Sequence, residues 1–432
     1  MTSPMGWNSW DCYGAAVTEE IVRRNADYMA EHLKEYGWNY VVVDIQWSNP
    51  TAPNHEYQPY AKLCTDEYSR LMPAPERFPS AAGGAGFKPL ADYVHSLGLK
   101  FGIHIMRGIP RQAVHMNTPI AGGYHARDIV RTDSICMWNT DMYGVDASKS
   151  GARDYYESLF SLYADWGVDF IKLDDIAREM PDCQAELTLI SECLRNCGRD
   201  MIFSISPGPS KLEYAEYYKQ VANMWRLTDD FWDNWSQLYE MFEICEKWSI
   251  HTGDKSWPDP DMLPIGALLQ DYSEDGWTKF TEDEQRTMMT LWCIMRAPLM
   301  IGGELTKVDD FTTKLVTCPG ILGMHCHARH SHQVYRRYVD SSGHFTLDKS
   351  DDGSELIIWT ATCDAGGTYI AAFNAGETDI SIDIPLSTLE IPSGLCRNLW
   401  TEELIRTDEE FATAEVLHLD IRKHDAAAYL FI

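Results

Sequence analysis

The sequence lacks the features that would direct a chain to a membrane or to nucleic acid. No apolar run reaches the roughly 18 residues that a transmembrane helix needs. Basic residues are scarce, with 36 Lys and Arg against 65 Asp and Glu, so the formal net charge is −29. Such a charge repels polyanions, which argues against nucleic acid and anionic membranes as partners.

Paired cysteines and an export signal are also missing. The 12 cysteines are scattered and none belongs to a Cys-x-x-Cys pair, so we expect free, mostly buried thiols. The amino-terminal segment MTSPMGWNSW has no basic stretch followed by an apolar one. We therefore predict no signal peptide and expect a cytoplasmic protein.

Short β-rich runs alternate with longer helical stretches over residues 5–301. The eight runs are Met5–Trp10, Asn39–Asp44, Lys100–Ile105, Asp169–Asp174, Met201–Ser206, Asn223–Thr228, Ser249–Thr252 and Pro298–Ile301. Helices are expected between them, for example over Glu19–Tyr36, Phe87–Leu97, Ala152–Trp166 and Gln184–Cys197. Gly98 and Gly167 stand where helices must end. Eight βα units close a barrel, so we predict an α/β fold with a (β/α)8 TIM barrel over residues 1–325.

The pattern changes after about residue 330. Short alternating runs follow one another, separated by Gly, Asp and Ser, at Gln333–Tyr338, Phe345–Leu347, Glu355–Thr360, Thr368–Phe373, Ile380–Ile384 and Ala426–Ile432. Alternation of this kind is typical of antiparallel strands. We predict a small antiparallel β-sandwich domain over residues 326–432.

Polar side chains gather at the carboxyl ends of the predicted barrel strands, where barrel enzymes carry their catalytic groups. These ends hold Trp10, Asp44, His104, Lys172, Asp174, Ser206, Arg226, Asp230 and His251. A barrel with a purely structural role would not need so many polar groups at one mouth.

Two segments supply carboxylates. In the strand that ends at Asp174, Lys172 lies on the same side, and its ammonium favours an ionised carboxylate, as a nucleophile requires. A simple surface ion pair is the alternative. In the second segment Asp229, Asp230 and Asp233 crowd among tryptophans, where one raised pKa would suit a general acid. The alternative there is a helix amino terminus, which Asp233 would fit.

Two carboxylates facing each other across a mouth are the minimum for glycoside hydrolysis. A separation of about 5 Å gives retention of configuration and about 6.5–9.5 Å gives inversion, but a sequence does not contain that distance.

The chain resembles glycoside hydrolase family 27, the family of α-galactosidases and α-N-acetylgalactosaminidases. The matching segments are residues 4–10 (PMGWNSW), Tyr40–Asp44, Asp165–Asp174, Arg226–Trp235, residues 257–263 (WPDPDML) and Ala297–Met300. The resemblance covers nearly the whole chain. It implies a retaining exo-α-glycosidase that needs no metal and no organic cofactor. The substrate would be an oligosaccharide or glycoconjugate, and a homo-oligomer would be in keeping with the family.

The resemblance implies roles position by position. Asp174 matches the nucleophile and Asp230 the acid/base. The matching substrate-binding positions are Trp10 under the sugar ring, Asp44 at the 4- and 6-hydroxyls, Lys172 at the 3-hydroxyl, Arg226 near the 2-position, and Asp261 with Met262 in a lining loop.

Departures from the family bear on the substrate. Family α-galactosidases usually have two adjacent aspartates where this chain has Asp44 and Ile45, and a tyrosine where it has His104. Ser206 lies near a position where N-acetylgalactosaminidases have a serine that leaves room for a 2-acetamido group. We therefore slightly favour N-acetylgalactosamine over galactose. Ile45 would also suit a sugar without a 6-hydroxyl, such as β-L-arabinopyranose.

Two other classes of function remain open. One is a carbohydrate-binding barrel without turnover, against which the presence of both aspartates argues. The other is a metal-assisted hydrolase, because His325, Cys326, His327, His330 and His332 are all zinc-ligand types. That segment lacks a second ligand cluster, so we expect no metal there.

Overall fold

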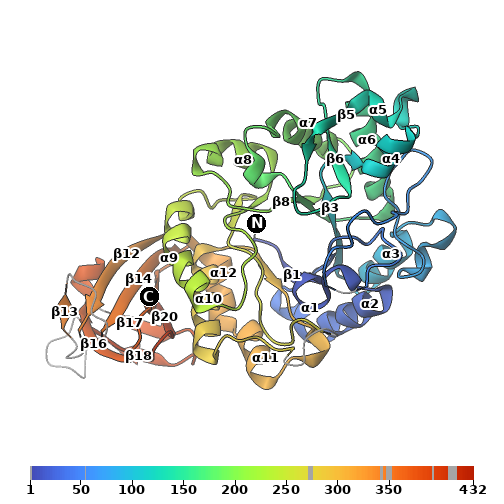
Figure 1. Ribbon diagram of the computed structural model, residues 1–432. Coiled ribbons are helices and arrows are strands. Elements are labelled where there is room, and N and C mark those ends of the chain that lie inside the picture. Colours follow the sequence, from blue (N-terminus) through green and yellow to red (C-terminus); the bar gives the residue numbers. More distant parts are fainter. Residues whose placement is uncertain are drawn as a thin grey trace.

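The structure is a computed structural model that describes residues 2–53, 55–270, 276–340, 344–346, 353–391, 394–406 and 416–432. A barrel of parallel strands with helices outside it forms the larger part, and antiparallel sheets follow it in the chain (Figure 1). In the described part of the chain, no helix is long and apolar enough to cross a bilayer.

The barrel is an 8-stranded parallel sheet in the order β10-β9-β8-β7-β3-β2-β1-β11. Its strands are β1 (Met5–Asn8), β2 (Tyr40–Val43), β3 (Lys100–Met106), β7 (Phe170–Asp174), β8 (Ile202–Ile205), β9 (Met224–Arg226), β10 (Trp257–Asp259) and β11 (Leu299–Ile301). A parallel bridge between Leu263 and Ile301 joins the segment after β10 to β11. The predicted TIM barrel is confirmed.

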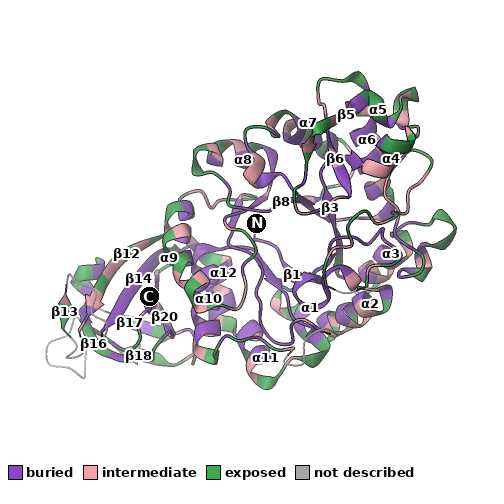
Figure 2. Ribbon diagram, viewed as in Figure 1, coloured by how far each residue is buried: buried purple, intermediate pink, exposed green. Residues whose placement is uncertain are grey.

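Both faces of the barrel strands are buried, which suits apolar and β-branched runs (Figure 2). The helices of the first 327 residues are α1 (Trp10–Tyr13), α2 (Glu19–Tyr28), α3 (Lys88–Ser96), α4 (Arg111–Met116), α5 (Ala126–Ile129), α6 (Ser150–Trp166), α7 (Gln184–Arg195), α8 (Ala215–Val221), α9 (Trp235–Ser249), α10 (Glu282–Met295), α11 (Asp310–Thr317) and α12 (Pro319–His327). Helix α6 ends at Gly167, which adopts the left-handed conformation with φ 84°. The sequence predicted this ending.

The predicted seventh strand, Ser249–Thr252, is wrong. Helix α9 runs to Ser249 and a turn follows, whereas the seventh barrel strand is β10. Pro258 argues against a central strand because it cannot donate to a ladder. It is tolerated because β10 is hydrogen-bonded as a strand only to β9, at an edge of the sheet. His251, predicted at the mouth, instead lies 3.5 Å from Glu216 of α8.

An inserted antiparallel sheet between β3 and α6 was not predicted. It has the order β4-β6-β5 and contains β4 (Ile109–Pro110), β5 (Val130–Ile135) and β6 (Met142–Val145). Strand β5 is largely exposed and its pairing with β6 has a register shift, so its alternation in sequence is weak. In Figure 1 the insertion lies at the upper right, on the side of the barrel away from the carboxyl-terminal sheets.

The carboxyl-terminal strands form a 7-stranded sheet, β13-β12-β14-β15-β20-β17-β18, and a pair, β16-β19. They are β12 (Ala328–Val339), β13 (Phe345–Thr346), β14 (Ser354–Cys363), β15 (Thr368–Asn374), β16 (Ile380–Pro385), β17 (Leu395–Asn398), β18 (Leu404–Arg406), β19 (Val416–Ile421) and β20 (Ala426–Phe431). The predicted antiparallel domain is confirmed. Strands β17 to β19 were not predicted, and Leu347 of the predicted Phe345–Leu347 run lies outside the described residues.

Alternate residues of β14 and β15 face two different apolar cores. Ile357 and Phe373 belong to the core shared with the barrel helices. Ile358 and Ala372 belong to the core beneath the β16–β19 pair. The 7-stranded sheet is therefore a wall common to both cores.

Candidate active site

Trp10 and Asp44 lie at the carboxyl ends of neighbouring barrel strands. Trp10 begins α1 directly after β1, and its ring is 9% exposed. Asp44 Oδ2 accepts hydrogen bonds from Asn8 Nδ2 at 2.8 Å and from Lys172 Nζ at 2.9 Å. Burial opposes ionisation of Asp44, but the Lys172 ammonium and His104 hold its pKa well below the usual range. Asp44 is thus an ionised acceptor at the mouth.

Asp174 is the last residue of β7 and is held at both carboxylate oxygens. Its Oδ2 lies 2.9 Å from His104 Nε2, and its Oδ1 accepts the backbone N–H of Asp175 at 3.0 Å. Burial alone would raise the pKa of Asp174, but the hydrogen bond to His104 and the charge of Lys172 lower it below the usual value. The carboxylate is therefore ionised at neutral pH and fixed in direction.

Arg226 ends β9 and bridges two carboxylates. Its Nη2 lies 2.9 Å from Asp230 Oδ1, and its Nη1 lies 2.9 Å from Asp261 Oδ1. The side chains of Arg226 and Asp261 are only 3% and 7% exposed, whereas that of Asp230 is 44% exposed. Asp230 is accordingly the member of this trio that meets solvent at the rim.

The Asp44–Lys172 and Arg226–Asp261 ion pairs lie beside one cavity inside the barrel. Asn8, Lys172, Arg226, Asp261 and Met262 line it together, so the Asp44–Lys172 and Arg226–Asp261 pairs lie at the same mouth. Nine predicted site residues gather at this end of the barrel, namely Trp10, Asp44, His104, Lys172, Asp174, Arg226, Asp230, Asp261 and Met262.

Ser206, the tenth predicted residue, lies deeper. Its side chain is 0% exposed, and its hydroxyl has no hydrogen-bond partner in the described part of the chain. Its backbone N–H donates to the carbonyl of Leu173 at 2.9 Å, and its carbonyl accepts from Ile176 at 3.0 Å. Ser206 therefore braces the strand end beside Asp174 and does not open onto the mouth.

An apolar cluster stands next to the charged groups. Trp10, Ile45, Met106 and Met262 belong to it, and Ile45 is only 2% exposed. Ile45 directly follows Asp44, so a hydrocarbon side chain borders the ionised acceptor.

The long connection between β2 and α3 supplies aromatic groups that the sequence reasoning missed. The Tyr57 ring stacks on Trp10, with centroids 5.3 Å apart and planes 12° apart, and Trp138 lies 5.3 Å from Tyr57. The His55 ring lies 4.4 Å from Trp10. A βα loop much longer than about 6 residues is itself a functional signal, and it could have drawn attention to these residues.

The crowded aspartates after β9 do not converge on one point. Asp229 Oδ2 accepts from Arg178 Nη1 at 2.9 Å, and Asp233 Oδ2 accepts the backbone N–H of Lys279 at 2.6 Å. The 257–263 motif holds two buried carboxyls with a raised pKa, Asp259 and Asp261. Burial and the neighbouring charge of Asp261 raise the pKa of Asp259 to about 7, and Arg226 only partly opposes this shift.

The histidine-rich segment does not assemble a ligand set. His325 Nε2 lies 2.7 Å from Ser3 Oγ and 2.8 Å from the Ala297 carbonyl, in the core. His327 Nδ1 lies 2.7 Å from Asp364 at the surface. Over the described ranges, no group of three or more His, Cys, Asp or Glu side chains could hold a metal ion.

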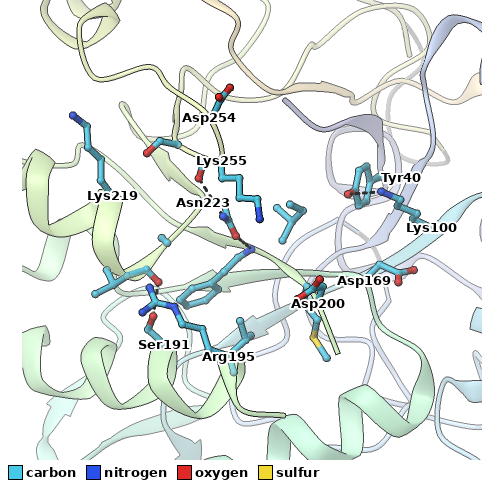
Figure 3. A pocket seen from close by; sticks show the side chains of 17 residues that line it. Tyr40, Lys100, Asp169, Ser191, Arg195, Asp200, Lys219, Asn223, Asp254 and Lys255 are labelled. Atoms are coloured by element: carbon cyan, nitrogen blue, oxygen red, sulfur yellow. Dashed lines mark hydrogen bonds between the residues drawn. The ribbon is translucent and has the colours of Figure 1, made fainter. Parts of the chain in front are cut away.

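A separate pocket opens at the other end of the barrel. Figure 3 shows Tyr40, Lys100, Asp169 and Asn223 around it, which stand at or just before the amino ends of β2, β3, β7 and β9. Lys100 Nζ donates to the Tyr40 hydroxyl at 3.1 Å. The mouth with Asp174 is at the carboxyl ends, so this pocket is not part of the candidate site.

The chain matches known proteins along most of its length. The family model described as alpha galactosidase A matches residues 2–150 and 146–325, and that of the alpha galactosidase C-terminal beta sandwich domain matches residues 353–431. A rice α-galactosidase is 24% identical over 99% of this chain and 84% of its own length.

Two bacterial structures are more similar. A family 27 β-L-arabinopyranosidase from Geobacillus stearothermophilus is 49% identical, with a TM-score of 0.90, covering 100% of this chain and 96% of its own. A protein from Bacillus halodurans, described provisionally as an α-N-acetylgalactosaminidase, is 47% identical, with a TM-score of 0.84, covering 100% of this chain and 97% of its own.

The two family models together span most of the chain, in the order of the two sheet systems. The similarity therefore includes the strands that carry Asp174 and Arg226 as well as the carboxyl-terminal sheets. This chain belongs to glycoside hydrolase family 27.

Proposed function

We propose that this chain is a retaining exo-glycosidase that prefers terminal β-L-arabinopyranosides, with Asp174 as nucleophile and Asp230 as acid/base. The observation that carries the choice of sugar is Ile45, buried in the apolar cluster directly beside the ionised Asp44. β-L-Arabinopyranose has the ring configuration of α-D-galactopyranose but no hydroxymethyl group. An apolar side chain at position 45 therefore suits the pentose, whereas the 6-hydroxyl of galactose would lose one of its two acceptors.

Asp174 has the properties of a nucleophile. It is ionised, and bonds from His104 and the Asp175 backbone fix its direction. In the first step a carboxylate oxygen of Asp174 bonds to the anomeric carbon as the bond to the leaving oxygen breaks. The product is a covalent glycosyl ester on Asp174.

The position of Asp230 supports a role in proton transfer. Its carboxyl group is half-exposed at the rim, where a leaving group and water can reach it, and Arg226 holds it at 2.9 Å. It donates its proton to the leaving oxygen in the first step. In the second step it takes a proton from the water that releases the sugar from Asp174.

The binding groups follow from the same geometry. The Asp44–Lys172 pair presents an ionised acceptor and two donors to adjacent ring hydroxyls, since Lys172 Nζ already donates its third N–H to Asp44 at 2.9 Å. Trp10 provides the flat apolar face on which a sugar ring stacks.

N-acetylgalactosamine is the second candidate, suggested by the serine at position 206. Its side chain is fully buried and is not among the residues that line the cavity with Lys172 and Arg226, which argues against a contact with an acetamido group. The provisional description of the Bacillus halodurans relative keeps this sugar in the test.

The test is hydrolysis of p-nitrophenyl glycosides of β-L-arabinopyranose, α-D-galactose and α-D-N-acetylgalactosamine. We expect the highest kcat/KM on the arabinoside. Ile45→Asp adds an acceptor for the 6-hydroxyl and should move the galactoside-to-arabinoside ratio about tenfold toward galactoside, the worth of one hydrogen bond. Ile45→Val keeps the wall apolar and is the matched control.

Three results would contradict the proposal. A wild-type preference for either hexoside would overturn the assigned sugar. Asp174→Asn should lower kcat by on the order of 10³-fold or more, and retention of full activity would overturn the assigned nucleophile. Sugar binding with no turnover on any of the three substrates would favour the non-catalytic barrel.

A further inference from the structure

Arg107 follows β3 and holds the short segment that carries Asp174. Its backbone N–H donates to the Asp174 carbonyl at 3.1 Å. Its Nε donates to the Asp175 carbonyl at 2.6 Å, and its Nη2 lies 2.9 Å from Asp175 Oδ2. One residue thereby grips two consecutive residues through both backbone and side chain.

The conformation of Asp175 explains why such a grip is needed. Its φ is 62°, in the left-handed region that residues other than glycine avoid. The backbone N–H of the same residue donates to Asp174 Oδ1 at 3.0 Å. The chain after Asp175 is anchored, because the Ile176 N–H donates to the Ser206 carbonyl at 3.0 Å. Relaxation of Asp175 toward a negative φ would therefore rotate the peptide unit before it, turn the Asp175 N–H away and free the Asp174 carboxylate to rotate.

Arg107 is itself fixed from behind. Its Nη1 donates to Ser134 Oγ at 2.9 Å and lies 3.3 Å from Glu186 Oε2, while Glu186 Oε1 accepts the Tyr156 hydroxyl at 2.6 Å. The side chains of Arg107, Asp175 and Glu186 are 3%, 6% and 4% exposed. All three guanidinium nitrogens already have partners within the protein, so the contacts of Arg107 are accounted for without a substrate.

The charges of Arg107, Asp175 and Glu186 depend on one another. Burial raises the pKa of Asp175 to about 6, against the lowering effect of Arg107. Burial also raises the pKa of Glu186, and Arg107 again opposes the shift. Without the guanidinium, two buried carboxyls would lose the cation that keeps them ionised.

We propose that Arg107 is a positioning residue that holds Asp175 in its left-handed conformation and so fixes the Asp174 carboxylate for attack. The inference rests on the proposed role of Asp174 as nucleophile. Arg107 acts on the attack step, not on sugar binding.

The test measures attack and binding separately. A cyclophellitol aziridine of galacto configuration without the hydroxymethyl group is opened by the nucleophile, which forms an ester that mass spectrometry locates. Saturation of the labelling rate gives a rate constant ki and a constant KI for binding. For Arg107→Met we expect ki to fall at least tenfold while KI changes less than about threefold. Arg107→Lys, which keeps the charge, should have a ki between those of Arg107→Met and the wild type. Arg153→Met, at an arginine whose side chain is 47% exposed, is the matched control and should equal the wild type.

Glycine at position 175 provides the decisive variant. Glycine adopts a positive φ without help, so Asp175→Gly in the Arg107→Met background should restore ki at least fivefold over Arg107→Met alone. The double variant also loses one buried unpaired carboxyl, which protects its folding.

The outcomes are distinguishable. An unchanged ki in Arg107→Met, equal losses in ki and binding, or no rescue by Asp175→Gly would overturn the positioning role. Failure of the wild type to be labelled at Asp174 would instead overturn the proposed nucleophile, and this inference with it.

Discussion

Asp259 carries a carboxyl group that titrates near neutral pH. Burial and Asp261 raise its pKa to about 7, from a value near 3.8 for a free side chain. Between these values the folded state binds a proton that the unfolded state has released, so the free energy of unfolding falls as pH rises through this window. Stability is thus lost toward neutral pH, the opposite of the usual carboxylate.

We predict that Asp259→Asn removes part of the decrease in the free energy of unfolding toward neutral pH. The amide keeps the acceptor that takes the backbone N–H of Asp261 at 2.9 Å and stays neutral at all pH values. Thermal melts at pH 7.5 should show the variant more stable than the wild type, by on the order of 1–4 kcal/mol, and the difference should shrink at pH 4.5. The exposed Asp92→Asn is the control, and a difference independent of pH would contradict the prediction.

At the residue scale, sequence reasoning found the charged groups of the site but not their partners. The alternation of side chains along a strand predicted that Lys172 and Asp174 lie on the same side of β7. The sharing of Arg226 between Asp230 and Asp261 required a contact between two loops, which no local pattern encodes. Tyr57 was missed for the same reason, because it reaches Trp10 from a long irregular connection. Arg107 was missed because it looks like an ordinary residue after β3.

At the element scale, Gly167 shows how one residue ends a helix. Its φ of 84° lies in the left-handed region, and a Cβ there would meet His95 Cε1 at 3.1 Å. We predict that Gly167→Ala lowers the free energy of unfolding by about 1–2 kcal/mol through backbone strain and crowding.

Denaturant melts would measure this loss. Gly83→Ala is a matched comparison, because it also has a positive φ, 71°, but no neighbouring atom within 4 Å. Equal destabilisation by both substitutions would assign the whole effect to backbone strain, and no loss at Gly167 would refute the prediction.

Long elements with strong periodicity were predictable, and short or interrupted ones were not. Helix α6 and strand β7 follow their sequence patterns to within two residues. Strand β10 contains Pro258 and was not predicted, because the proline is tolerated only where β10 is ladder-paired with β9 alone, and the sequence does not reveal that pairing. The partly exposed strand β5 and the short strand β17 bury too few side chains to leave a clear alternation.

At the scale of the whole molecule, the barrel and the terminal sheets share a core. Phe373 of β15 lies against Phe242 of α9 with ring centroids 5.1 Å apart, and both are fully buried. Asp425, just before β20, forms an ion pair with Arg286 of α10, with Arg286 Nε 2.9 Å from Asp425 Oδ1. Such continuity predicts that the two parts unfold together.

We expect calorimetry to show a single transition in the wild type. Phe373→Ala should lower the free energy of unfolding by about 3–5 kcal/mol and shift the whole transition, since the cavity opens in the common core. Ile382→Ala, in the core beneath the β16–β19 pair, is the comparison. A second, separate transition in Phe373→Ala would mean that the two parts are only loosely joined.

The wall formed by β14 and β15 also constrains how such a protein can change through evolution. In each of these two strands, alternate side chains pack into different cores. Phe373 packs into the core shared with the barrel helices, and Ile358 packs into the core beneath the β16–β19 pair. If the terminal region were exchanged with that of a distant relative, the side chains of β14 and β15 that pack against the barrel helices would no longer fit them. Recombination at their junction would therefore disturb a shared core, even though the chain crosses there only once.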